Sequence, residues 1–436
     1  MIWKSYGTHF AALLRRGKSG PARRMAWAIG DQALSSVTNF LLSVAVARTV
    51  GPVEFGAFSL AFAVYLVCVV IARALSTAAL TIRYSGADTI AWRNATAAAA
   101  GAAVVVGLVG GVLVLVVATA IGGASGPVLQ ILAIGLAPLL LQDAWRYALF
   151  AVGRARAAFM TDLVWLLGFA ASFGLVTMVL GEPSVGALVA AWVAGGAAGA
   201  VLGAFLCGTA PKPLRTLAWW KKHREIVTNL TAENLLVSGG LPLTLIGVTA
   251  ISGLATAGAL RAGQVLMNMI HVPSYGMSMF AIPEAVRLRR RSRSAVLTLS
   301  ALIGAILAML ALAWGGILLL LPLDAGRALL GDTWATARDV ILPLSLLTAA
   351  LGVQSGAKVG LRAYALTRRS LYARFVTSAL MVAGGLGGAA AGGAQGAAWG
   401  IASGVAIGTV LWWHQLLTPP TADGDAMNTH IDLGEA

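Results

Sequence analysis

The sequence predicts an all-α integral membrane protein of about twelve transmembrane helices, arranged as two six-helix bundles around a central cavity. Among its 436 residues, 58% are hydrophobic and only 11% are charged, whereas a soluble domain has about 25% charged residues. The apolar residues also fall into successive runs of about twenty, the length of a helix that crosses a bilayer. Finally, residues 31–56 match residues 233–258 in residue type, which indicates a chain that is built twice.

The first span of one half aligns with the first span of the other at a constant offset of 202 positions. Asp31 and Gln32 align with Glu233 and Asn234, so an acid and an amide open a long apolar run in each half. Gly51 and Gly253 align in the turns that follow these runs. Because each half holds six predicted spans, both halves start on the same side, which predicts a parallel repeat about an axis along the membrane normal.

The segments follow one another in a regular order. A basic head, residues 1–24, precedes the first bundle, residues 25–207, with spans near 25–47, 57–80, 95–121, 127–150, 158–180 and 185–207. A polar connection, residues 208–228, leads to the second bundle, residues 229–416, with spans near 229–250, 257–281, 295–321, 337–358, 371–391 and 395–416. A short polar tail, residues 417–436, ends the chain.

The distribution of basic residues predicts the orientation. Of the 31 lysines and arginines, 25 fall in the head and in every second connection, and the other connections hold only Arg48, Arg327 and Arg338. By the positive-inside rule, both termini and the 208–228 connection are cytoplasmic, in the cytoplasmic (inner) membrane. The net charge of +15 therefore reflects topology and contact with anionic membrane lipid, and we expect no nucleic-acid partner.

Ionisable side chains within the spans are the candidate functional residues, because each costs several kcal/mol unless it has a partner or faces a wet cavity. Two structural alternatives stay open: Asp143 and Arg146, three residues apart, neutralise each other, and Asp31 and Glu233 form hydrogen bonds across helices. The spread of charge over five spans favours a hydrated cavity that carries both signs. The candidate cavity residues are Asp31, Gln32, Arg73, Asp143, Arg146, Glu233, Asn234, Arg261 and Gln264.

One further acid has a local interpretation. Asp162 falls in the first turn of the span predicted at 158–180, where a carboxylate complements the positive end of the helix dipole. We therefore interpret Asp162 as a helix-capping residue.

Small residues recur at helical spacing in two spans. Gly195, Gly199 and Gly203 follow one another at every fourth position, and Gly396, Gly400, Gly404 and Gly408 do the same. Small residues at this spacing let membrane helices approach closely. The pattern predicts helix packing at these faces.

The sequence contains no recognisable catalytic motif. It has no HExxH, Walker A or GxSxG pattern. Its two cysteines, Cys68 and Cys207, both lie in apolar runs, which argues against a cysteine-ligated metal. We expect no enzymatic activity, no cofactor and no metal, and transport that is secondary or driven by substrate flow.

The stretch DQALSSVTNFLLSVAVARTVGPVEFGAFSLAFAVY, residues 31–65, resembles the opening of bacterial polysaccharide flippases of the O-antigen type. These belong to the multidrug/oligosaccharidyl-lipid/polysaccharide (MOP) exporter superfamily. Residues 141–159, 258–268 and 329–346 are similar to later parts of the same proteins. The combination of these stretches with twelve spans and a six-plus-six repeat carries the resemblance.

The resemblance implies a transporter for polysaccharide biosynthesis. Such proteins carry undecaprenyl-pyrophosphate-linked oligosaccharide units from the inner to the outer leaflet by alternating access. It also implies that arginines in the cavity, here Arg73, Arg146 and Arg261, meet the pyrophosphate and sugars. Polysaccharide polymerase or export machinery is the implied partner, and proton or cation coupling stays open.

Two other functions are compatible with the pattern. A drug or cation antiporter of the same superfamily also has twelve spans, but three intramembrane arginines suit an anionic headgroup better than a cationic drug. A membrane-embedded glycan polymerase or ligase usually has a long polar outer loop. The longest outer connection here, residues 322–336, has no histidine and only two acids.

The topology is directly testable. Reporter fusions after Gly123, Glu182 and Asp324 should report the outside, because the basic residues hold the alternate connections in the cytoplasm. A fusion after Lys222 serves as the cytoplasmic control. Cytoplasmic signals from two of the three outer fusions would contradict the twelve-span arrangement.

Overall fold

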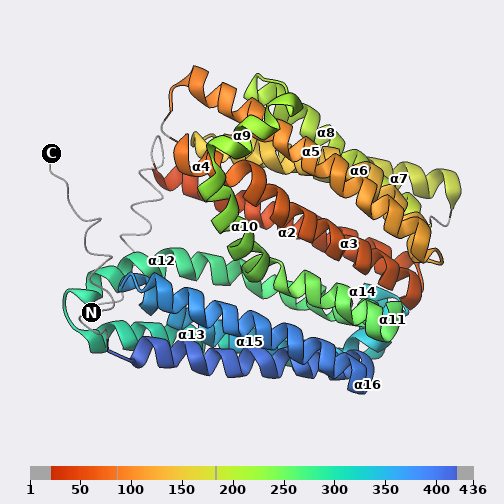
Figure 1. Ribbon diagram of the computed structural model, residues 1–436. Coiled ribbons are helices and arrows are strands. Elements are labelled where there is room, and N and C mark those ends of the chain that lie inside the picture. The colour runs from red at the N-terminus through yellow and green to blue at the C-terminus, as the bar shows by residue number, and fades with distance from the viewer. Residues whose placement is uncertain (1–20, 86, 182–183, 420–436) are drawn as a thin grey trace. The chain divides into compact units, whose positions relative to one another are not determined.

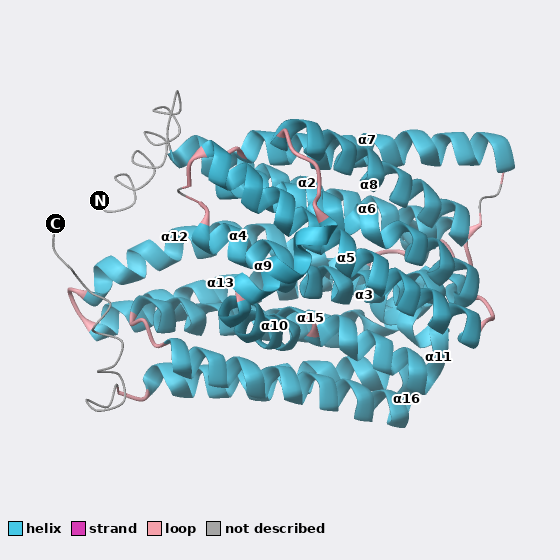
Figure 2. Ribbon diagram, turned by 45° about the horizontal axis from the view of Figure 1, so that its top comes forward, coloured by secondary structure: helices cyan, strands magenta, loops and turns pink. Residues whose placement is uncertain are grey.

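The computed structural model describes residues 21–85, 87–181 and 184–419, and every regular element in these ranges is a helix (Figure 2). The predicted fold class is confirmed. Within the described ranges, nine helices are long and apolar enough to cross a membrane. The chain divides into two compact units between Leu235 and Leu236, and each is described by itself. The cavity expected between the bundles stays a prediction.

In the first unit, five of the candidate membrane spans follow α2, which corresponds to the first predicted span (Figure 1). The second span is a continuous helical rod in three parts, α3, a π-helical turn η1, and α4. The elements of the spans are α2 (Pro21–Thr49), α3 (Pro52–Ala72), η1 (Arg73–Thr77), α4 (Ala78–Arg83), α5 (Thr89–Ile121), α6 (Ser125–Ala151), α7 (Ala155–Leu180) and α8 (Val185–Cys207). The connection that follows holds η2 (Pro213–Arg215), α9 (Thr216–Lys222) and α10 (Arg224–Ser238).

The second unit, whose helices α11, α13, α15 and α16 run side by side in Figure 1, repeats this order. A short helix, α14, precedes its fourth span. Its elements are α11 (Gly240–Met267), η3 (Asn268–Ile270), α12 (His271–Arg289), α13 (Arg293–Leu320), α14 (Leu323–Leu330), α15 (Thr333–Ala363) and α16 (Thr367–Leu417).

Two glycine kinks reconcile these helices with the twelve predicted spans. The backbone of α11 breaks at Gly253, where φ is +82°, and that of α16 breaks at Gly392 and Gly393. Positive φ strains residues that carry a Cβ, so glycine permits these sharp turns. Each kink separates two spans within one nominal helix. Helix α2 corresponds to the span predicted near 25–47, and α10 covers the beginning of the span predicted near 229–250. Gly253 is the residue that the repeat aligns with Gly51, the N-cap of α3, so the aligned glycines both lie at the turn between the first two spans of a half.

The same pairs of spans pack together in both units. In the first unit, α6 packs on α3, α5 and α8, and α7 packs on α2 and α8. In the second unit, α15 correspondingly packs on α11, α13 and α16, and α11 packs on α16. The same order of packing in both units agrees with the internal repeat found in the sequence.

The periodic glycines lie at close helix contacts, as predicted. A Cβ added to Gly195 would lie 2.6 Å from the carbonyl oxygen of Trp165, and one added to Gly199 would lie 2.9 Å from that of Thr161. In α16, a Cβ on Gly400 would overlap the backbone of Gly384, which faces it from the other half of the helix. Only glycine, which has no Cβ, fits at these positions, because the helix backbones themselves are in contact.

Replacing Gly400 with alanine should therefore destabilise the second unit by about 1–3 kcal/mol or more, because the methyl group must displace backbone atoms. The matched control is Gly387→Ala in the same helix, where an added Cβ meets nothing within 4 Å. The melting temperatures of the purified variants measure the difference. If G400A melts with G387A, the two halves of α16 do not pack as described.

Candidate functional site

One face of α6 carries the centre of the candidate site. Asp143, Arg146, Tyr147 and Phe150 are spaced at i, i+3, i+4 and i+7, so their side chains project from the same side of the helix. Asp143 and Arg146 are buried, at 6% and 9% exposure. Because α6 packs against six other elements of the first unit and Asp143 and Arg146 are buried, this face projects into the unit.

Arg146 is the common partner of two acids from other helices. Its Nε lies 2.8 Å and its Nη2 2.5 Å from Oδ2 of Asp31, which is fully buried in α2. The same Nε lies 3.3 Å from Oδ2 of Asp162 in α7. One guanidinium thus joins α2, α6 and α7 at a point where the carboxylates of Asp31 and Asp162 are both buried.

Arg73 forms the second ion pair of the cluster. It lies in the π turn η1, and its Nε and Nη2 each donate to one oxygen of Asp143 at 2.8 Å. This two-point geometry is the strongest that arginine and a carboxylate make. The guanidinium also lies over the ring of Tyr147, 4.9 Å from its centroid. The Arg73 side chain is 36% exposed, against 8% for that of Asp143, so this pair reaches the border of the buried region.

The cluster holds more acid than base. Three carboxylates, those of Asp31, Asp143 and Asp162, share the two guanidinium groups. Gln142 lowers the cost of burying Asp162, since its Nε2 donates to Oδ1 of that acid at 2.7 Å. With all five groups ionised, the cluster carries one excess negative charge. At low dielectric such an excess favours uptake of a proton or a cation.

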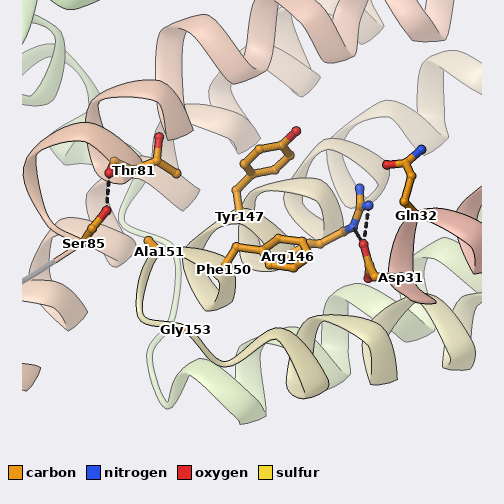
Figure 3. A pocket seen from close by; sticks show the side chains of 9 residues that line it. All are labelled: Asp31, Gln32, Thr81, Ser85, Arg146, Tyr147, Phe150, Ala151 and Gly153. Atoms are coloured by element: carbon orange, nitrogen blue, oxygen red, sulfur yellow. Dashed lines mark hydrogen bonds and ion pairs between the residues drawn. The ribbon is translucent and has the colours of Figure 1, made fainter. Parts of the chain in front are cut away.

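A cavity of about 680 Å³ opens beside this cluster (Figure 3). Figure 3 shows Thr81 of α4 and Ser85, just after α4, on one side and the Arg146–Asp31 pair on the other, with Tyr147 between them. The lining therefore combines hydroxyls, an aromatic surface and a charged pair. It consists of Asp31, Gln32, Thr81, Ser85, Arg146, Tyr147, Phe150, Ala151 and Gly153.

Two sequence-based interpretations of the charges are wrong in part. Asp143 and Arg146 are not a self-sufficient pair: their closest approach is 3.9 Å, and both make shorter bonds to other residues. Asp162 is not a capping residue, because α7 begins at Ala155 and Asp162 lies two turns inside it. The cross-helix hydrogen bond considered for Asp31 is present, with Arg146 as its partner.

The remaining predicted site residues lie elsewhere. Glu233 and Asn234 fall in α10, but their side chains are outside the described part of the chain. Arg261 and Gln264 are buried in α11 of the second unit, at 7% and 9% exposure. The structure therefore brings together Asp31, Gln32, Arg73, Asp143 and Arg146, all from the first unit.

Several residues of the site were missed from the sequence. Tyr147 and Phe150 could have been found from their helical spacing to Asp143 on α6. Thr81 and Ser85 gave no signal, because a hydroxyl near a helix end commonly bonds its own backbone, as both Thr81 and Ser85 do here. Within the described residues, no group of three or more His, Cys, Asp or Glu side chains is placed to hold a metal ion.

Comparison with known proteins gives a likeness in structure. No protein-family profile and no curated protein sequence matches the chain. An inward-facing multidrug resistance MATE family transporter of the MOP superfamily superposes with a TM-score of 0.68 at 14% identity, covering 89% of this chain and 97% of that one. The lipid II flippase MurJ, in an inward closed conformation, superposes with a TM-score of 0.69 at 10% identity, covering 91% and 88%.

A third solved structure extends the comparison. A MOP superfamily transporter from Pyrococcus furiosus superposes with a TM-score of 0.54 at 14% identity, covering 90% of this chain and 93% of that one. At these identities the likeness establishes the fold alone. This chain has the fold of MOP superfamily transporters.

Replacing Arg146 with alanine should destabilise the first unit strongly, because Asp31 and Asp162 would stay buried without their cation. Removing one partner of a buried ion pair costs about 3–5 kcal/mol. The control is Arg287→Ala, which breaks an exposed pair with Glu284 that contributes about 0–1 kcal/mol. Melting temperatures in detergent should fall for R146A and stay near wild type for R287A. Equal values would contradict the structural role of Arg146.

Proposed function

We propose that this chain is a secondary transporter that moves a pyrophosphate-linked oligosaccharide on a polyprenyl carrier from the inner to the outer leaflet of the cytoplasmic membrane. Three lines of support lead to this proposal: the sequence resemblance to polysaccharide flippases, a fold shared with a lipid II flippase and MATE transporters, and the cavity of the first unit. In this proposal both termini are cytoplasmic, the chain is not an enzyme, and alternating access moves the headgroup across the membrane.

The observation that carries the proposal is the geometry of Arg73. Asp143 and Tyr147 hold its guanidinium from two sides, yet about a third of the side chain is exposed. Two of its three nitrogens are committed to Asp143. A held, partly exposed guanidinium offers the planar donor arrangement that phosphate oxygens accept.

The cavity lining suits the sugar end of such a substrate. Thr81, Ser85 and Tyr147 provide hydroxyls that donate to and accept from sugar hydroxyls, and Phe150 provides an apolar ring face. A volume of about 680 Å³ is in the usual range of about 300–1,000 Å³ for small-ligand sites. We propose that the cavity receives the pyrophosphate and the first sugars, while the lipid chain stays in the bilayer.

The acid excess supports ion coupling. In the proposed cycle, an anionic headgroup at Arg73 competes with Asp143, and the carboxylate that is released gains a proton or a cation.

The same excess of negative charge favours a second candidate, a drug or cation antiporter, because a cationic substrate could neutralise the cluster directly. We keep the flippase as the first candidate because Arg73 is the more exposed member of its pair. In the proposed role, polysaccharide polymerase or export machinery would receive the transported unit.

A reconstituted assay tests the proposal. Liposomes that contain the protein and a fluorescent undecaprenyl-pyrophosphate-linked sugar should expose the label to an impermeant quencher faster than empty liposomes. Arg73→Ala should slow this by about tenfold or more, since a hydrogen bond to a charged group contributes about 1.5–3 kcal/mol. Arg73→Lys should retain part of the rate because it keeps the charge.

The control is Arg327→Ala, which removes an exposed cation from α14 and should leave the rate unchanged. Absence of lipid movement by the wild-type protein, together with proton-driven exchange of a cationic dye, would replace the flippase proposal with the antiporter. Equal rates for R73A and wild type would remove Arg73 from the site.

A further inference from the structure

The connection between the two units contacts the second span at two points. Near one end of α4, Tyr84 packs against α9: its ring lies 5.9 Å from that of Trp219, and its hydroxyl accepts from Nζ of Lys222 at 3.0 Å. Near the other end, the indole N–H of Trp220 donates to the carbonyl oxygen of Leu75 at 2.9 Å. Leu75 is the central residue of the π turn η1. Residues of α9 and its C-terminal end thus contact the second span just before and just after the short helix α4.

The connection itself is fixed to the first unit. The backbone N–H of Lys212 donates to the carbonyl oxygen of Ala97 in α5 at 2.8 Å. Gly101 allows this approach, because a Cβ there would overlap the Lys212 backbone. At the other end of α9, His223 is buried, and its Nδ1 lies 3.0 Å from the carbonyl oxygen of Trp219. Burial, with Lys222 and Arg83 nearby, lowers the pKa of His223 below its ordinary value, which favours a neutral ring at neutral pH.

The π turn sets which residues share a face of the second span. In an uninterrupted α-helix each residue rotates by about 100°, so Arg73 and Thr81, eight positions apart, would point about 80° apart. A π turn accommodates one extra residue and so removes the rotation of one residue, about 100°. Arg73 and Thr81 then point within about 20° of each other. Ser85 follows the end of α4 at Arg83, so its position is set by the turn after the helix. The observed contacts agree: Thr81 lines the cavity with Tyr147 (Figure 3), and the Arg73 guanidinium lies over the Tyr147 ring.

We propose that Trp220 is a positioning residue for this site: its indole N–H holds the π turn at Leu75 and thereby keeps Arg73 on the same face as the cavity hydroxyls. The inference rests on the proposed function for its biological meaning, but its geometry can be tested without transport. A π turn leaves the regular hydrogen-bond pattern of the helix, so an external donor to a carbonyl within it opposes its relaxation to an α-helix. Since α9 leads through α10 to the second unit in the chain, motion transmitted along this connection reaches the π turn through Trp220.

The test reads the electrostatic potential at Thr81. In a protein with Cys68→Ala and Cys207→Ala, a cysteine introduced by Thr81→Cys is labelled with an anionic and with a cationic methanethiosulfonate at low salt. A unit positive charge about 8 Å away changes the ratio of the two rates by about fivefold. Trp220→Phe keeps an aromatic ring and removes the N–H, so the anionic-to-cationic ratio should fall by about that factor as Arg73 turns away.

The matched control is Trp219→Phe, one position earlier in α9. The buried indole nitrogen of Trp219 makes no hydrogen bond among the described residues, so W219F removes similar volume without removing a bond, and its ratio should stay at the wild-type value. In a protein with Arg73→Gln, the ratio should already be low, and W220F should lower it no further. This non-additivity separates positioning of Arg73 from general loosening of the unit.

Three results would overturn the proposal: an unchanged ratio in W220F, an equal fall in W219F and W220F, or a further fall when W220F is combined with R73Q. None of these depends on which substrate the protein carries. If the reconstituted wild-type protein fails to move the pyrophosphate lipid while the labelling results hold, the proposed function fails and the role of Trp220 in the geometry of the site stands.

Discussion

The first unit depends on the neutralisation of buried charge around Arg146. A carboxylate inside a membrane-spanning bundle has no water to solvate it, so it is stable only beside a cation or a dense set of hydrogen-bond donors. Asp31 and Asp162 both meet this requirement through the one guanidinium of Arg146, and Gln142 adds a donor for Asp162. Because these acids lie on α2 and α7, Arg146 of α6 joins three helices of the first unit.

The two arginines of the cluster differ in what their surroundings allow. Arg146 contacts two buried acids and also lines the cavity, and its removal would leave both acids without their cation. Arg73 contacts one acid, Asp143, and one aromatic ring, that of Tyr147, and its side chain is 36% exposed. In the proposed function, Arg146 therefore has the structural role and Arg73 the contact with the ligand. The two arginines are also linked, since Asp143 lies between both guanidinium groups, and a change at one alters the charge felt by the other.

The π turn shows how a local departure from regular geometry serves a site. A rod of uniform α-helix would separate the cation of Arg73 from the hydroxyl of Thr81 around its axis. The turn aligns them, and α9 supplies a side-chain donor to a carbonyl within it. The donor comes from the segment that joins the two units along the chain. Cavity geometry and the connection are therefore parts of one hydrogen-bonded arrangement within the first unit.

The sequence by itself determined the class of the protein, the positions of the spans, the repeat and the close packing at its periodic glycines. These follow from composition and from spacing along one helix, which are local properties. The aligned Gly51 and Gly253, for example, mark equivalent turns because a sharp reversal constrains the residue at that point. Only the tertiary structure decided that Arg73 pairs with Asp143, that Arg146 pairs with Asp31 and Asp162, and that Trp220 reaches Leu75. Each of these contacts joins different helices, and spacing within a helix carries no information about the distance between two of them. The helical spacing of Asp143 and Arg146 therefore predicted correctly that they share a face of one helix, but their main ion-pair partners, Arg73 and Asp31, lie on other helices.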